Sequence, residues 1–492
     1  MSQFARSVFT RWRALSPASQ FLFGASSGLA AYRVWNRRQQ HSDSSSHSPN
    51  SDSTDPSKQK VVLGSETLLN PHKGVSRVDQ AQLIFDGEPE KSKNGIRSLR
   101  TKGTPWFALA IFDGSIGREA SSFLRNSFLD LMGGALSEIL KEDNKSNRTS
   151  LIEEAMRGLY VAADGLITHE TVEALQKAYS SGTHREKFIF AATEVVAVAR
   201  AASGALLGVF DADEKKLYVA NVGEARAVLG RPRKTARGKT IYDIHVLSVD
   251  HTLDNPDEVT RLLAAHPNEP DLLRELFAAD PERRTTRAFG DARMKWSRER
   301  QKWLHETALS DAPSDECRTP PYITVEPSMT TIDIQSGDVL VMASHGLFEC
   351  LTNEEVVGLV GVWLEEGHAD KPILSNKQPT PAPEQTEQTE PLPIEAVDAP
   401  TRMTLPELLL TIKPVERVDL AVTLTENKTH YSKWPAFKKR FVCTTFPNSA
   451  VHLIQNALGG AHGELLALNL ANGLRGNAQV RDDISMHVVF FE

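Results

Sequence analysis

Residues 205–230, ALLGVFDADEKKLYVANVGEARAVLG, decide the fold class. The apolar run 205–210 and the alternating run 216–222 flank a polar turn, which is the pattern of a β-hairpin. A second turn follows at 223–224, and 226–230 predicts a third strand. Strands joined by such short turns predict an antiparallel sheet, because parallel neighbours need long crossover connections.

Elsewhere, buried strands are separated by groups of helices. Short apolar runs at 106–112, 338–343 and 484–491 predict buried strands. Helical spacing of apolar residues predicts helices at 118–136, 150–179, 254–265, 353–366 and 448–458. Helices between groups of strands favour an α+β fold of antiparallel sheets over a doubly wound parallel sheet.

Composition excludes several classes of protein. The 492 residues are 40% hydrophobic, which excludes a wholly disordered chain. The net charge of −7 argues against a nucleic-acid partner, since nucleic-acid binders usually carry a basic excess. The three cysteines are too few and too scattered for a disulfide framework or a zinc site.

The two ends of the domain are marked by composition. Residues 1–40 contain six arginines and no acid, which predicts a mitochondrial presequence. Within them, the uncharged residues 18–32 predict membrane association as an alternative, although they are shorter than the roughly 20 residues of a spanning helix. The Ser/Asp/Pro-rich residues 41–60 predict a disordered linker, and one domain is expected over 61–492. The Pro/Glu/Gln-rich residues 368–400 predict a flexible insertion in it.

Acidic residues stand at three predicted strand ends. Asp113 follows the strand at 106–112, Glu224 follows the hairpin, and Asp482 precedes the last strand. Each acid alone is most simply a turn residue. Together they predict a shared oxygen-ligand site for Mg²⁺ or Mn²⁺.

Six segments, in the same order along the chain, resemble the motifs of the metal-dependent protein phosphatase 2C (PPM-type) family. They are AIFDGSIGREAS (110–121), the hairpin region 199–230, LSVDHTLDNPDEVTRL (247–262), TTRAFGDARMKW (285–296), VLVMASHGLFECL (339–351) and VRDDISMHVVFF (480–491). Three further segments are similar to mitochondrial pyruvate dehydrogenase phosphatases of fungal type: 287–297, 319–327 and 450–460.

The resemblance implies both a fold and an activity. The fold is a layered α/β/β/α sandwich of two antiparallel sheets flanked by helices. The activity is hydrolysis of phosphoserine or phosphothreonine in a phosphoprotein by water activated at two Mg²⁺ or Mn²⁺ ions. The pyruvate dehydrogenase complex is the implied partner, and the mitochondrion is the implied location.

The same resemblance assigns roles to individual residues. Asp113 matches the bridging metal ligand, Gly114 a carbonyl ligand, and Asp482 the last metal-binding acid. Asp79 matches the second acid of an early Glu-Asp pair. Glu224 matches an acid that supports the site without bridging the ions.

Further assignments complete the predicted site. Asp483 is expected to support its neighbouring ligand, and Arg77 is expected to bind phosphate, with Lys73 as an alternative. Ser115 stands at the position of the family's catalytic histidine.

The match also contains departures that bear on catalysis. His345 replaces a metal-binding Asp, Val78 replaces the Glu of the early pair, and Ser115 replaces a His. Two readings follow. Either the chain is a phosphatase with a modified site, in which Asp113, Asp482 and His345 hold one ion, or it is a pseudophosphatase that acts as a mitochondrial binding or regulatory protein.

Overall fold

The computed structural model describes most of the predicted domain. The described residues are 62–85, 94–100, 104–141, 147–180, 185–271, 273–278, 285–367, 413–423, 441–443, 446–466 and 482–492. The predictions for 1–40, 41–60 and 368–400 fall outside these residues. In the part of the chain that is described, no helix is both long and apolar enough to cross a membrane.

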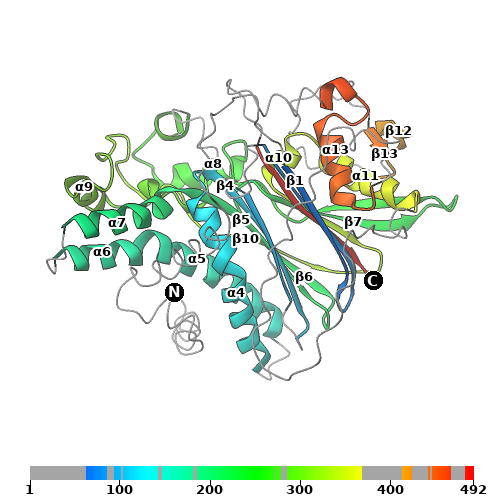
Figure 1. Ribbon diagram of the computed structural model, residues 1–492, viewed down its shortest axis with the longest axis horizontal. Helices are drawn as coiled ribbons and strands as arrows, with labels where there is room; N and C mark the ends of the chain where they lie inside the picture. The colour runs from blue at the N-terminus through cyan, green and yellow to red at the C-terminus, as the bar shows by residue number, and fades with distance from the viewer. Residues whose placement is uncertain are drawn as a thin grey trace, which may run out of the picture.

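Two antiparallel sheets form the centre of the molecule (Figure 1). The first has the order β1 (Val62–His72), β2 (Val75–Ile84), β14 (Ile484–Phe491), β11 (Val339–Ala343), β7 (Arg226–Lys234) and β8 (Thr240–Val246). The second has the order β10 (Ser328–Asp333), β6 (Lys216–Val222), β5 (Ala202–Asp211), β4 (Trp106–Ile116) and β3 (Asn94–Arg100), and β9 (Phe289–Gly290) also pairs with β5. A separate pair joins β12 (Lys413–Val415) to β13 (Phe441–Cys443).

Helices lie on both sides of the sheets (Figure 1). One group lies against the second sheet: α4 (Glu119–Lys141), α5 (Arg148–Gly165), the π-helix η4 (Leu166–Glu170), α6 (Thr171–Ser180), α7 (Arg185–Arg200) and α9 (Arg298–Glu306). The other lies against the first sheet: α10 (His345–Phe348), α11 (Asn353–Glu365) and α13 (Ser449–Leu458). Shorter helices complete the set: α8 (Pro256–Ala265), η5 (Leu273–Ala278), η6 (Ala292–Met294) and η8 (Arg417–Asp419).

The side-chain alternation of β4 explains the layers. Ala108 and Phe112 pack with the helices α4 and α5, whereas Leu109 and Ile111 pack between the two sheets. Successive side chains of a strand point to opposite faces, so a strand covered on both faces must be apolar at every position. This requirement produces the unbroken run WFALAIF, and the predicted four-layer α/β/β/α sandwich is confirmed.

The predicted strands and helices are found close to their expected bounds. The stretch 150–179 is divided between α5 and α6 by the π-turn of η4. The hairpin of β1 and β2 did not stand out in the sequence, because β2 contains the buried polar residues Arg77, Asp79 and Gln80. Asp79 and Gln80 also have partners in other segments, Ser449 and Glu66, and such contacts leave no trace in the local pattern.

Candidate functional site

Four segments meet where the two sheets end. Asp113 lies near the end of β4, Glu224 in the turn between β6 and β7, His345 at the start of α10, and Asp482 just before β14. His345 contacts both Asp113 and Glu224, and a ring nitrogen of His345 lies within 4.8 Å of a carboxylate oxygen of Asp482. The structure therefore brings together the strand-end acids singled out in the sequence.

The Asp113 carboxylate is partly buried among like charges. Burial raises the pKa of Asp113 to about 6, and the charges of Asp482 and Glu224 act in the same direction. The backbone N–H of His345 opposes this shift by donating a 2.8 Å hydrogen bond to Asp113 Oδ2. A carboxylate in this position is stabilised by any cation that enters the site.

The His345 ring lies between two carboxylates. Its Nδ1 is 3.0 Å from Glu224 Oε2, and its Nε2 is 3.3 Å from Glu349 Oε1, one helical turn further along. A neutral imidazole has a single N–H, so only the protonated ring can donate to both carboxylates. Glu349 was not predicted to belong to the site. Its spacing of four residues from His345 on a helix is the signal that could have found it.

Asn94 links the segment of Asp113 and Gly114 to the segment of Asp482 and Asp483. The sequence analysis did not single it out. Its side chain accepts a hydrogen bond from Gly114 N–H at 3.2 Å and donates one to the carbonyl of Asp483 at 2.9 Å. The Asp483 carboxylate accepts the Phe85 N–H at 3.1 Å. Asp483 therefore fixes the segment next to Asp482, as expected of a supporting residue.

Two backbone features shape the site around these acids. Ser115 lies at an irregularity of the β4–β5 pairing, between Gly114 and Ile116, as a β-bulge would place it. At Gly346, a Cβ atom would lie only 2.7–2.8 Å from the carbonyl oxygens of Asp483 and Asp482. Glycine is therefore required after His345, whatever residue precedes it.

Asp79 lies outside this site, and its assignment as a metal ligand is corrected here. It is opposite Val488 in the sheet, four residues before Leu83, whose partner Ile484 begins β14. That spacing corresponds to about 13 Å along the strand. The Asp79 carboxylate accepts hydrogen bonds from the N–H and the hydroxyl of Ser449, both at 2.7 Å, at the start of α13. Its role there is to bind the N–H and hydroxyl of the first residue of α13, next to the N-cap residue Asn448.

The neighbours of Asp79 are corrected with it. Arg77 donates to Asp79 Oδ1 at 2.9 Å and to the Pro447 carbonyl, and its guanidinium lies over the Trp363 ring. This buried arginine is not placed to bind phosphate. Val78 belongs to the apolar core between the sheets. Lys73 pairs with the exposed Asp213. The β2–β14 register places Phe85 level with the site, and the next residue, Asp86, lies outside the described residues.

The turn that carries Glu224 is held in place by hydrogen bonds between Gly223 and His251. Gly223 N–H donates to His251 Nδ1 at 3.2 Å, and His251 N–H donates to the Gly223 carbonyl at 3.0 Å. Burial, together with the charge of Arg287, lowers the pKa of His251 to about 3. The ring is therefore neutral at physiological pH, which allows Nδ1 to act as an acceptor.

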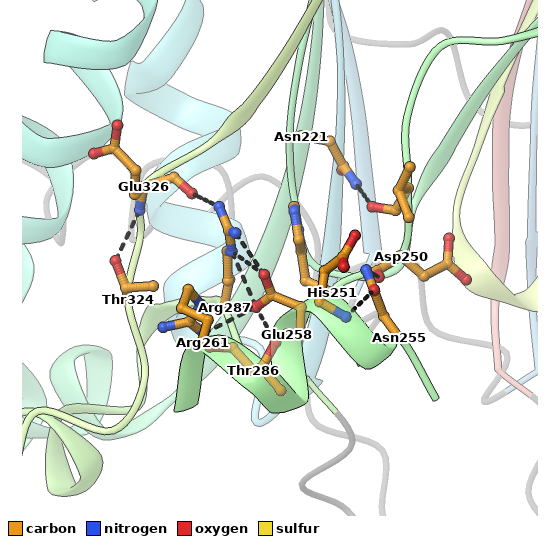
Figure 2. Close-up of polar contacts among 12 residues, drawn as sticks. Asn221, Asp250, His251, Asn255, Glu258, Arg261, Thr286, Arg287, Thr324 and Glu326 are labelled. Atoms are coloured by element: carbon orange, nitrogen blue, oxygen red, sulfur yellow. Dashed lines mark hydrogen bonds and ion pairs between the residues drawn. The ribbon is translucent and has the colours of Figure 1, made fainter. Parts of the chain in front are cut away.

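An ion cluster centred on Glu258 supports this region (Figure 2). Glu258 accepts hydrogen bonds from Arg287, Arg261 and Thr286. Burial alone would raise the pKa of Glu258, but these three donors lower it to about 2. Thr286 N–H also donates to the His251 carbonyl at 2.8 Å, so the cluster is continuous with the Glu224 turn.

These residues do not fit a pair of Mg²⁺ ions. Mg²⁺ requires oxygen ligands, whereas His345 offers nitrogen and the Asp79 carboxylate is elsewhere. The residues do fit one ion that accepts imidazole, such as Mn²⁺ or Zn²⁺. His345, Glu349 and Asp482 each offer one ligand atom, and these atoms all lie within 4.8 Å of one another. This set contains Glu349 where the sequence predicted Asp113.

Comparison with known proteins finds relatives at modest sequence identity. A protein phosphatase 2C homologue of Schizosaccharomyces pombe is 27% identical, covering 85% of this chain and 81% of that protein. A mitochondrial pyruvate dehydrogenase phosphatase of Saccharomyces cerevisiae is 26% identical, covering 86% and 70%. The bovine pyruvate dehydrogenase phosphatase 1 is 34% identical, but over only 35% and 33%.

A solved serine-threonine phosphatase 2C of Toxoplasma gondii aligns with 88% of this chain and 95% of its own. Its TM-score is 0.40 and its sequence identity 14%. The family model for protein phosphatase 2C matches residues 87–386, which is more than half of the sequence. The chain belongs to the protein phosphatase 2C family.

Proposed function

We propose that this chain is a pseudophosphatase, which binds a phosphorylated protein in the mitochondrion and regulates it without hydrolysing it. The observation that carries the proposal is the position of His345 between Glu224 and Glu349. An imidazole stands where the family has a metal-binding carboxylate, and both of its nitrogens face acids that would otherwise be available to cations. Relatives named as mitochondrial pyruvate dehydrogenase phosphatases support the location and suggest pyruvate dehydrogenase as the partner.

The proton-transfer side of the chemistry supports the same proposal. Ser115 stands where the family has a histidine, and a serine hydroxyl is far too weak an acid to protonate a leaving group near neutral pH. Asp113 Oδ2 is already engaged by the His345 N–H. The fold therefore keeps the strand ends that carry a phosphatase site, while the groups that would activate water and release the product alcohol are altered.

A second candidate is a phosphatase that uses a single metal ion. It is favoured by the convergence of four carboxylates, those of Asp113, Glu224, Glu349 and Asp482, around one imidazole. Even with a protonated ring, this arrangement carries an excess of negative charge. His345, Glu349 and Asp482 would hold the ion, which would supply Lewis-acid chemistry when bound.

Phosphate release from a phosphoserine peptide, measured with the full chain, separates the two candidates. Mg²⁺, Mn²⁺ and Zn²⁺ should be titrated in turn, with Asp113→Asn as the matched inactive control. The pseudophosphatase predicts no release above that control with any ion, together with preferential binding to phosphorylated over unphosphorylated pyruvate dehydrogenase. Metal-dependent release that Asp113→Asn abolishes would establish the single-ion phosphatase instead.

A further inference from the structure

Two arginines beside the candidate site share a single carboxylate oxygen. Arg200, at the end of α7, lies 3.1 Å from Asp311 Oδ2, and Arg293, in η6, contacts the same oxygen. The Asp311 side chain is 75% exposed, whereas those of Arg200 and Arg293 are 35% and 38% exposed. The two arginine side chains are thus about half as exposed as the carboxylate that they share.

The pair lies near the strand ends that carry the site. Asp291 N–H donates to the carbonyl of Ala201, next to Arg200, at 2.9 Å. Ala202 pairs with both Gly290 and Ile116, and two residues further on, Gly204 is the partner of Asp113. Arg200 therefore begins the segment that leads directly to the neighbour of Asp113, and Arg293 follows the segment that pairs with it.

Charge is segregated along this part of the chain. The described residues 285–302 contain six basic residues, against the two acids Asp291 and Glu299. The next residues, 303–317, contain four acids and no lysine or arginine. Besides Asp311, this acidic loop places Asp315 3.3 Å from Arg298, whose guanidinium also donates to the carbonyls of Ser314 and Cys317. The acidic residues of 303–317 therefore contact basic residues of 285–302, in the way that the acidic groups of a bound ligand would.

We propose that Arg200 and Arg293 form a binding site for an oxyanion on an acidic, phosphorylated segment of a protein partner, and that Asp311 is an internal occupant which the partner displaces. Paired guanidiniums are suited to phosphate and carboxylate, because each presents several N–H donors in one plane. The converging carboxylates of the neighbouring site repel a phosphate, so recognition without metal requires cations of this kind beside it. The inference rests on the proposed function in taking a phosphoprotein as the partner, but not on the absence of hydrolysis.

The test is binding of a fluorescent phosphoserine peptide that carries acidic residues to the full chain, followed by anisotropy at two salt concentrations. Asp311→Asn should tighten binding at least threefold, because the arginines lose their internal partner. Arg200→Gln combined with Arg293→Gln should weaken binding about tenfold and reduce its salt dependence. Competition by inorganic phosphate, compared with competition by the unphosphorylated acidic peptide, distinguishes the phosphoryl group from the carboxylates as the bound oxyanion.

The matched control is the exposed pair of Arg233 and Asp243, 2.9 Å apart on β7 and β8 of the other sheet. Asp243→Asn makes the same change in net charge and should leave peptide binding unchanged. Equal affinity of wild type and Asp311→Asn, or an equal gain from Asp243→Asn, would overturn the proposal. Arg200→Lys with Arg293→Lys keeps the charge and tests the fork geometry if the glutamine variants fold poorly. Detection of hydrolysis would end the pseudophosphatase proposal without affecting this comparison, since the same variants would then change KM.

Discussion

The imidazole of His345 lies 3.0 Å from Glu224 and 3.3 Å from Glu349, with one carboxylate at each ring nitrogen. The ring therefore occupies the space between two acids, at the position that the resemblance to the protein phosphatase 2C family assigns to a metal-binding Asp. The arrangement makes His345→Asp the most informative substitution in the site. It adds a fifth carboxylate to the four that already converge there.

His345→Asp should increase the affinity for Mn²⁺ and Mg²⁺ at least tenfold, because it adds an oxygen ligand that carries a negative charge. Isothermal titration calorimetry with each ion measures the change. The matched control is His305→Asp, which makes the same change on α9, away from the site. If His345→Asp binds neither ion more tightly than wild type, the proposed obstruction by the ring is wrong.

Asp113→Asn should stabilise the fold at pH 8. The pKa of Asp113 is about 6 in the folded protein, against 3.8 as its ordinary value, so the folded state holds this proton more tightly than the unfolded state does. The resulting contribution to stability is present below about pH 4 and is lost as the pH rises through 6. We expect the variant to gain about 1–3 kcal/mol over wild type at pH 8 and little at pH 4.

Urea unfolding at the two pH values, without added metal, measures this difference. Asp213→Asn serves as the control, because Asp213 is an exposed acid that pairs with the exposed Lys73. A gain at pH 8 that also occurs at pH 4, or that Asp213→Asn reproduces, would contradict the assignment of the effect to Asp113.

Glu258→Gln should destabilise the protein by about 1–3 kcal/mol at pH 7, because it leaves Arg287 and Arg261 without their buried anion. The pKa of Glu258 is about 2 when folded and 4.5 ordinarily, so its contribution is present above pH 4.5 and is lost as the pH falls through 2. The difference between variant and wild type should therefore shrink in acid, as followed by urea unfolding at pH 7 and pH 3. Asp257→Asn, on the exposed face of the same helix, should cost under about 1 kcal/mol.

The sequence predicted the fold well where a strand is apolar at every position. In the run 106–112 both faces of β4 are covered, so every residue is apolar and the local sequence alone indicates a buried strand. The strand-end acids Asp113 and Asp482 were placed correctly for a related reason, since an acid next to such a run must lie where the core ends.

Residues whose role depends on distant partners could not be predicted in this way. Asp79 looked like a ligand because it is an acid beside Val78 in a motif-like stretch, but its partner Ser449 lies 370 residues away. Asn94 was missed for the same reason, since its role is not visible without its folded neighbours, whereas Glu349 could have been found from its spacing of four residues from His345. Register between strands, rather than motif spacing, decides which end of β2 faces the site.

The corrected role of Asp79 gives a last prediction. Its carboxylate is fully buried, accepts two hydrogen bonds from Ser449 and pairs with Arg77, so Asp79→Ala leaves a buried guanidinium and removes the acceptor of the Ser449 N–H at the start of α13. We expect a loss of about 3–5 kcal/mol in the free energy of unfolding. Asp79→Asn keeps one acceptor oxygen and should lose less.

Neither Asp79 variant should change the affinity for Mn²⁺, measured by calorimetry on the folded protein. Asp482→Asn should reduce it, because Asp482 and not Asp79 lies beside His345 and Glu349. A loss of metal binding in Asp79→Asn, with the fold intact, would show that Asp79 is a metal ligand after all, contrary to the position that the β2–β14 register gives it.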